Sequence, residues 1–153
     1  MSTPTELVNP VTNIRFAIEI GGEIVAWFTE CSGLSVQRET ETHEEGGTNH
    51  YVHQLPGRIK YTNITLKRGI SDQDEMLWDW FQKGLYDAKV DRKNVSILLF
   101  SPDRTKAKRW NLENAYPVKW SGPDFNTGGQ AVAIETLEFV HHGMQMTGWE
   151  RVA

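Results

Sequence analysis

Hydrophobic and polar residues alternate with a period of two from residue 14 onward. Residues 14–20 place isoleucine or phenylalanine at every second position, which is typical of a half-buried strand. Gly21-Gly22 predicts a two-residue hairpin turn, because both glycines can adopt positive φ. A returning strand is expected over residues 23–29. Residues 31–33 (Cys-Ser-Gly) interrupt the alternation and predict a break before a third strand, which starts at Leu34.

The predicted third strand becomes polar on both faces. Residues 37–49 read QRETETHEEGGTN. Gly46-Gly47 predicts a tip or bend, and Pro56-Gly57 predicts a turn on the way back. An isolated hairpin that is polar on both sides is not stable in water. We therefore expect this segment to pair with another copy of the chain or to face an aqueous interior, since exposed strand edges promote assembly.

The remaining sequence predicts one helix among further strands. A strand over residues 58–68 precedes Ser71, a candidate N-cap with an acidic residue three positions on, and we expect a helix over 72–87. The apolar residues of this helix form one stripe, which consists of Met76, Leu77, Trp80 and Phe81, with Leu85 one turn further on. Further strands are expected over residues 94–100, 106–116, 117–121 and 130–142.

These elements predict a single β-rich domain of about eight strands and one helix. The domain is expected to span residues 1–153, with residues 1–12 as a flexible N-terminal arm.

Composition limits the function. The chain has 153 residues, of which 39% are hydrophobic, and a formal net charge of −4. No apolar run approaches the length of a membrane span, so we expect no stable membrane insertion by the chain itself. The acidic balance argues against a duplex-binding surface. The single cysteine, Cys31, excludes an internal disulfide framework and fits a reducing compartment. The N-terminus has no signal-peptide pattern.

Candidate chemistry is sparse. His43, His50 and His53 lie in the polar segment, without a carboxylate or cysteine at a zinc-type spacing. His141-His142 are neighbours on a predicted strand and therefore point to opposite faces. The sequence has no G-x-S-x-G turn and no phosphate-binding glycine loop. We therefore predict no catalytic residue, no metal, no cofactor and no enzymatic activity.

The six tryptophans allow a second interpretation, a carbohydrate-binding β-sandwich that stacks sugars on exposed aromatic rings. Trp80 is assigned to the core, whereas Trp78 and Trp149 are the ones expected to be exposed in a monomer. Exposed aromatics also mark protein interfaces. The alternative stays open at this point.

Three sequence blocks resemble a known family. They are NITLKRGISDQDEMLWDWF at residues 63–81, LPGRIKY just upstream, and AIETLEFVHHGM at 133–144. The chain resembles the tail tube proteins of contractile phages and the inner-tube proteins of extracellular contractile injection systems, from residue 16 to residue 144. The family has no catalytic motif to carry over.

The resemblance implies a mainly β fold with one α-helix, in which two packed antiparallel sheets form part of a hexameric β-barrel tube similar to that of type VI secretion. It implies a structural subunit whose rings stack around a lumen that passes cargo protein or DNA. The implied partners are other copies of the chain, a sheath protein, and baseplate, spike and terminator proteins. The implied location is the bacterial cytoplasm during assembly and then a phage virion or phage-tail-like particle.

The resemblance also implies contact residues. The family's long loop contacts neighbouring subunits and the next ring, and here it corresponds to residues 42–56. The candidates in this loop are Thr42, His43, Glu44, Glu45, Gly46, Gly47 and His50. The candidate lumen-facing residues are Gln37, Glu39 and Glu41, or, on the opposite parity, Arg38, Thr40 and Thr42. Whether the chain is the repeating tube subunit or a ring near the baseplate is also left open.

Overall fold

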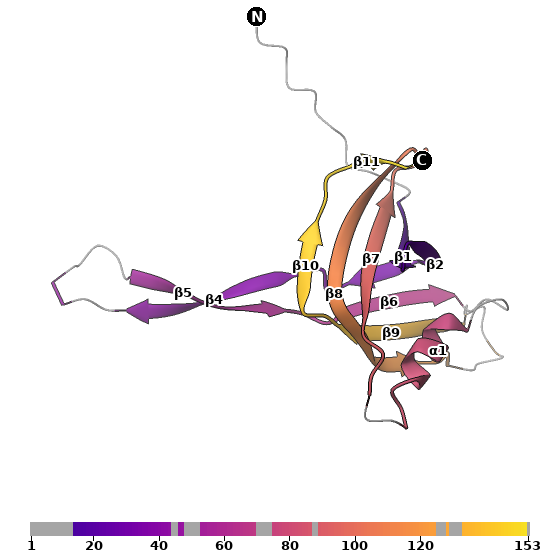
Figure 1. Cartoon of the computed structure of the whole chain (residues 1–153), viewed down its shortest axis with the longest axis horizontal. Coiled ribbons are helices and arrows are strands. Elements are labelled where there is room, and N and C mark those ends of the chain that lie inside the picture. The colour runs from indigo at the N-terminus through magenta and orange to yellow at the C-terminus, as the bar shows by residue number, and fades with distance from the viewer. Residues whose placement is uncertain are drawn as a thin grey trace, which may run out of the picture.

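A computed structural model (Figure 1) describes residues 14–43, 46–47, 53–69, 75–86, 89–124, 128 and 133–152. Within these ranges the chain forms eleven β-strands and one α-helix. They are β1 (Arg15–Ile20), β2 (Glu23–Phe28), β3 (Glu30–Ser32), β4 (Val36–His43), β5 (His53–Tyr61), β6 (Ile64–Gly69), α1 (Met76–Gln82), β7 (Lys93–Phe100), β8 (Lys106–Ser121), β9 (Ile134–Val140), β10 (Gly143–Met146) and β11 (Glu150–Arg151). The prediction of a mainly β chain with one helix is confirmed.

The long strand β8 belongs to two antiparallel sheets. Its first part pairs with β7 as far as Ala115, and its last part, from Tyr116, pairs with β9. Sheet A therefore has the order β2-β1-β7-β8, with β10 and β11 on the other edge of β8, and sheet B has the order β8-β9-β6-β3. The Thr29 amide donates to the Lys67 carbonyl oxygen (2.9 Å) and links β2 of sheet A to β6 of sheet B.

The core lies between the two sheets and α1. Because side chains alternate along a strand, every second residue of β6 and β9 is buried, including Leu66 and Phe139. Ile18 of sheet A is also fully buried. From the helix, Leu77 and Trp80 pack into the same cluster. The Trp80 indole donates a hydrogen bond to the Asp91 carbonyl oxygen (2.8 Å), so the ring's polar atom is satisfied.

The predicted strand pattern is wrong at two places. Residues 30–32 form β3 rather than a turn, and the strand expected over 58–68 is divided between β5 and β6. The pairs Ser32–Thr65 and Val36–Tyr61 follow one register. The strands β3 and β4 with β5 and β6 are therefore a single long hairpin, interrupted near Gly33.

Pro56-Gly57 is also not a turn. Both residues lie inside β5, where the pairing register with β4 shifts between Arg38 and Thr40. A Cβ on Gly57 would lie 2.8 Å from the Glu39 carbonyl oxygen. The Pro-Gly pair marks a β-bulge, a feature that shares the sequence signature of a turn.

The helix is shorter than the predicted 72–87. It ends at Gln82, and turns follow over residues 83–85. Ser71, the expected N-cap, lies outside the described residues. The predicted strands 106–116 and 117–121 are one strand, β8. The strand predicted over 130–142 becomes β9, with β10 after it. Residues 1–12 lie outside the described part of the chain.

Candidate assembly surfaces

β4 and β5 form a two-stranded projection, the hairpin arm (residues 36–43 and 53–61), which extends away from the rest of the subunit (Figure 1). Most of its side chains are exposed on both faces. Lys60 forms an ion pair with Glu39 across the strands. Val36 and Ile59 are exposed hydrophobic residues, at 52% and 45% of their surface. The arm thus leaves the core with apolar surface uncovered.

The two faces of the arm differ in character. Gln37 pairs with Lys60, and Glu41 pairs with Leu55 after the bulge. Because directly paired residues share a face, these residues and Glu39 make one largely charged face, the polar row. The opposite face carries the other parity, and its members are Val36, Arg38, Thr40 and Thr42 of β4 with Ile59 and Tyr61 of β5.

Contacts at the base of the arm show how its faces relate to the body. Leu34 packs against the hydrophobic core, so Val36, on the same parity, continues the core side. The Tyr61 ring lies 5.0 Å from the ring of His141, which is buried. The polar row therefore continues the outer face of sheet B.

The outer face of sheet B is polar on its successive strands. Thr65 and Lys67 of β6 alternate with buried aliphatic residues, and Lys67 lies 3.8 Å from Glu30 of β3. Glu138 of β9 accepts a hydrogen bond from the Asn63 side chain (2.8 Å). The same face includes Thr136 of β9 and Lys119 and Ser121 of β8. Its acidic and basic side chains are interspersed.

The outer face of sheet A is different. Ala17, Leu98 and Phe100 are buried there in a second small cluster. The Trp27 ring packs against the Phe100 ring with a tilt of 41° and centroids 5.2 Å apart, yet remains 46% exposed. Within the described part of the chain, only sheet B therefore combines an apolar inner face with an outer face dominated by polar side chains.

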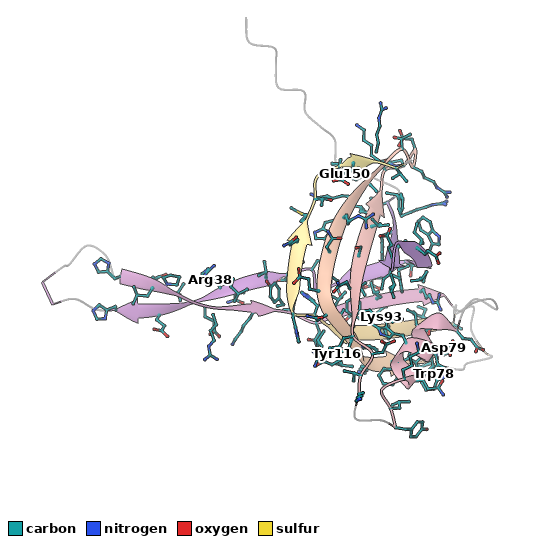
Figure 2. All side chains as sticks on the ribbon, in the orientation of Figure 1. Arg38, Trp78, Asp79, Lys93, Tyr116 and Glu150 are labelled. Atoms are coloured by element: carbon teal, nitrogen blue, oxygen red, sulfur yellow. The ribbon has the colours of Figure 1, made fainter. Side chains whose placement is uncertain are left out.

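An apolar groove of about 280 Å³ lies where α1 approaches the last part of β8. Trp80 and Phe81 line it from the helix, and Tyr116 lines it from β8. Its exposed hydrophobic residues are Leu85, Val90 and Val118, at 45%, 37% and 42%. Figure 2 shows Trp78 and Asp79 on α1 at the opposite end of the molecule from Arg38 on the arm.

The structure places the residues of the predicted loop at the end of the arm. Thr42 and His43 end β4, and Gly46 and Gly47 form a turn. Glu44, Glu45 and His50 lie outside the described residues.

Of the four predicted helix-core residues, Leu77 and Trp80 are buried and Phe81 is half-buried; Met76 begins α1. Trp78, expected to be exposed, instead packs edge-to-face on Trp120 at 4.9 Å.

The titratable groups do not form a catalytic arrangement within the described ranges. Burial raises the pKa of the Cys31 thiol to about 11, which disfavours the nucleophilic thiolate. Burial lowers the pKa of His141. Among the residues that the structure describes, no three His, Cys, Asp or Glu side chains are grouped so that they could hold a metal ion. No helix in the described part is long and apolar enough to cross a membrane.

This combination of a polar sheet face, a projecting hairpin and an apolar groove is typical of a subunit built for self-assembly. The family model described as "T4-like virus tail tube protein gp19" matches residues 12–145. The chain belongs to this tail tube family, as the sequence blocks predicted. A comparison with curated protein sequences found no match.

Solved structures agree with the family. A chain of the PVC sheath-tube complex, an extracellular contractile injection system in the extended state, is 27% identical with a TM-score of 0.79, covering 95% of this chain and 99% of that one. A chain of the PVC sheath/tube terminator is 26% identical with a TM-score of 0.81, covering 93% and 99%. A chain of the six-fold symmetrised anti-feeding prophage baseplate is 28% identical with a TM-score of 0.75, covering 97% and 98%.

The fold also extends to a more distant protein. Hcp1 from Flavobacterium johnsoniae is 16% identical with a TM-score of 0.55, covering 90% of this chain and 99% of that one. The predicted likeness to the type VI tube component is confirmed at the level of fold. The comparisons give no support to the alternative of a carbohydrate-binding module.

Proposed function

We propose that the chain is a structural subunit of the inner tube of a contractile injection system, and that six copies close into a ring. The observation that carries the proposal is the outer face of sheet B, which is dominated by polar side chains while its inner face is buried and apolar. A sheet of this kind, joined edge to edge with its copies around an axis, gives a closed barrel with a hydrated lumen and no free edges. The six-fold symmetry of the anti-feeding prophage baseplate supports the number of copies.

The lumen in this proposal is lined by sheet B and continued by the polar row Gln37, Glu39 and Glu41. Leu34 supports this choice over the opposite parity, which consists of Arg38, Thr40 and Thr42. Leu34 packs on the core, so the side chains on its face of the strand, beginning with Val36, point away from the proposed lumen. The loop at residues 42–56 then reaches a subunit of the next ring.

The chain is proposed to have no enzymatic activity. Its proposed partners follow the relatives: sheath, terminator and baseplate proteins in a phage or phage-tail-like particle that is assembled in the bacterial cytoplasm, with protein or DNA as cargo. The tube and terminator relatives match this chain almost equally well. A chain of the baseplate structure matches as well, so both the position of a repeating tube subunit and that of a ring near the baseplate are retained.

Electron microscopy of the purified protein tests the proposal. We expect rings or stacked tubes from the wild-type chain, and single rings that fail to stack after deletion of residues 43–54. The deletion variant should keep a β-type circular dichroism spectrum, because none of the described residues in this segment belongs to the core. A wild-type protein that stays monomeric at high concentration would contradict the function. Normal tubes from the deletion variant would contradict only the role of the loop.

A further inference from the structure

Sheet B ends differently on its two sides. On one side, β3 continues into the hairpin arm. On the other side, β7 accompanies β8 only as far as Ala115. Among the described residues, none pairs with the last part of β8 on the side opposite β9. With respect to the described part of the chain, residues 116–121 therefore present an open strand edge, a template for another strand.

Exposed apolar side chains lie at both of these places, among others on the surface. The core-side face of the arm exposes Val36 and Ile59. The groove beside the free edge exposes Leu85, Val90 and Val118. In the subunit, α1 and sheet A cover the inner face of sheet B, but the arm projects beyond them (Figure 1). The apolar face of the arm is therefore uncovered in the single subunit, and the apolar groove of another copy would cover it.

The charges on the polar side are complementary. Glu41 of the arm and Lys119 of β8 are both exposed, and neither has an ion pair within the described part of the chain. Both lie on the polar side of their strands, Lys119 paired with Glu138 of β9. Opposite charges facing each other across neighbouring strands are stabilising.

We propose that the hairpin arm of one copy lies along the free edge of β8 in the next copy. Sheet B continues across the junction, Val36 and Ile59 enter the groove of the neighbour, and Glu41 approaches its Lys119. The arm and the groove lie at opposite ends of the subunit (Figure 2), so the contact is head-to-tail and repeats until it closes into a ring. This inference rests on the proposed function and assigns its subunit contact.

The test compares three aspartate variants of the full chain by electron microscopy and analytical ultracentrifugation. Ile59→Asp alters the arm, Val118→Asp alters the groove, and Ile24→Asp on sheet A is the matched control, since Ile24 is 44% exposed and Ile59 45%. We expect the first two to lose at least tenfold in assembled protein and the control to assemble as the wild type does. Circular dichroism and the thermal midpoint establish that each variant folds.

A charge exchange keeps the test decisive if an aspartate variant does not fold. Glu41→Lys or Lys119→Glu alone should weaken assembly, and the double exchange should restore it, because the pair is re-formed with reversed signs. Full assembly of both single variants, or no recovery in the double variant, would overturn the contact. If Ile59→Asp forms intact rings that merely fail to stack, the arm serves stacking and the inference is wrong, although the function stands. A wild-type chain that forms no ring refutes the function itself.

Discussion

His141 is the residue whose environment has the clearest consequence in solution. Its side chain is buried, its Nδ1 lies 3.1 Å from the Gly143 carbonyl oxygen, and its Nε2 has no partner within the described residues. Burial lowers its pKa from the ordinary value of 6.5, and the neighbouring His142 acts in the same direction. Protonation would place a second N–H in a position without an acceptor, so the folded state favours the neutral ring.

The folded subunit should therefore lose stability as the pH falls below 6.5. Over the interval between the unfolded and the lowered folded pKa, the unfolded chain binds more protons than the native one, so the free energy of unfolding rises with pH. Denaturant titrations of dispersed subunits at pH values from about 7.5 to about 5 measure this slope. His141→Gln should flatten it, whereas His142→Gln, at an exposed position, should reduce it only slightly, because burial of His141 is the larger cause of the shift. Equal slopes in the wild type and His141→Gln would contradict the assignment.

At the scale of elements, the junction between the body and the hairpin arm depends on one glycine. Gly33 has φ of +92°, and a Cβ there would lie 1.9 Å from the Asn63 carbonyl oxygen. The Thr62 hydroxyl donates to the Gly33 carbonyl oxygen (2.8 Å), which fixes the two strands at this point. The strand pairing of the long hairpin is interrupted here, so the arm's direction is set where only glycine fits.

Gly33→Ala should cost more stability than the conformation alone explains. Gly22 is a suitable comparison, because its φ is +86° and a Cβ there meets nothing within 4 Å. We expect Gly22→Ala to lower the free energy of unfolding by about 1–2 kcal/mol, the cost of the left-handed backbone, and Gly33→Ala to lower it by more. Chemical denaturation of both variants gives the comparison. Equal losses would show that the Asn63 carbonyl moves aside without cost.

The strands of the body could be predicted from the sequence, because alternation is a local property. The hairpin β1–β2 and the strand β7 fall within a residue or two of their expected bounds. Pro56-Gly57 was mistaken for a turn because a bulge uses the same residues. The helix was predicted over 72–87 because Leu85 keeps the apolar stripe, but Leu85 is 45% exposed and helps to line the groove. Its role depends on Val90 and Val118, which come close only in the fold.

At the scale of the whole molecule, the feature hidden from sequence inspection is the division of β8 between two sheets. Strand order arises from pairings between distant residues, such as Ile64 with Phe139, and alternation does not specify partners. The same holds for the groove, which combines α1 with β8. The polar pattern of residues 37–49 did indicate an unusual environment. The structure adds that Gln37, Glu39 and Glu41 of this segment continue a polar face of sheet B.

A lumen position for that face can be distinguished from a subunit contact by the size of a thiol reagent. Lys67 lies on the outer face of sheet B with 42% of its side chain exposed. In dispersed subunits, Lys67→Cys should react equally with a small maleimide and with one attached to a large polymer. In assembled tubes the small reagent should still enter, while the polymer is excluded and reacts at least tenfold more slowly. Cys31 adds little background, because burial raises the pKa of its thiol to about 11. Protection from both reagents would place Lys67 in a subunit contact, and equal labelling by both would place it on the outside of the tube.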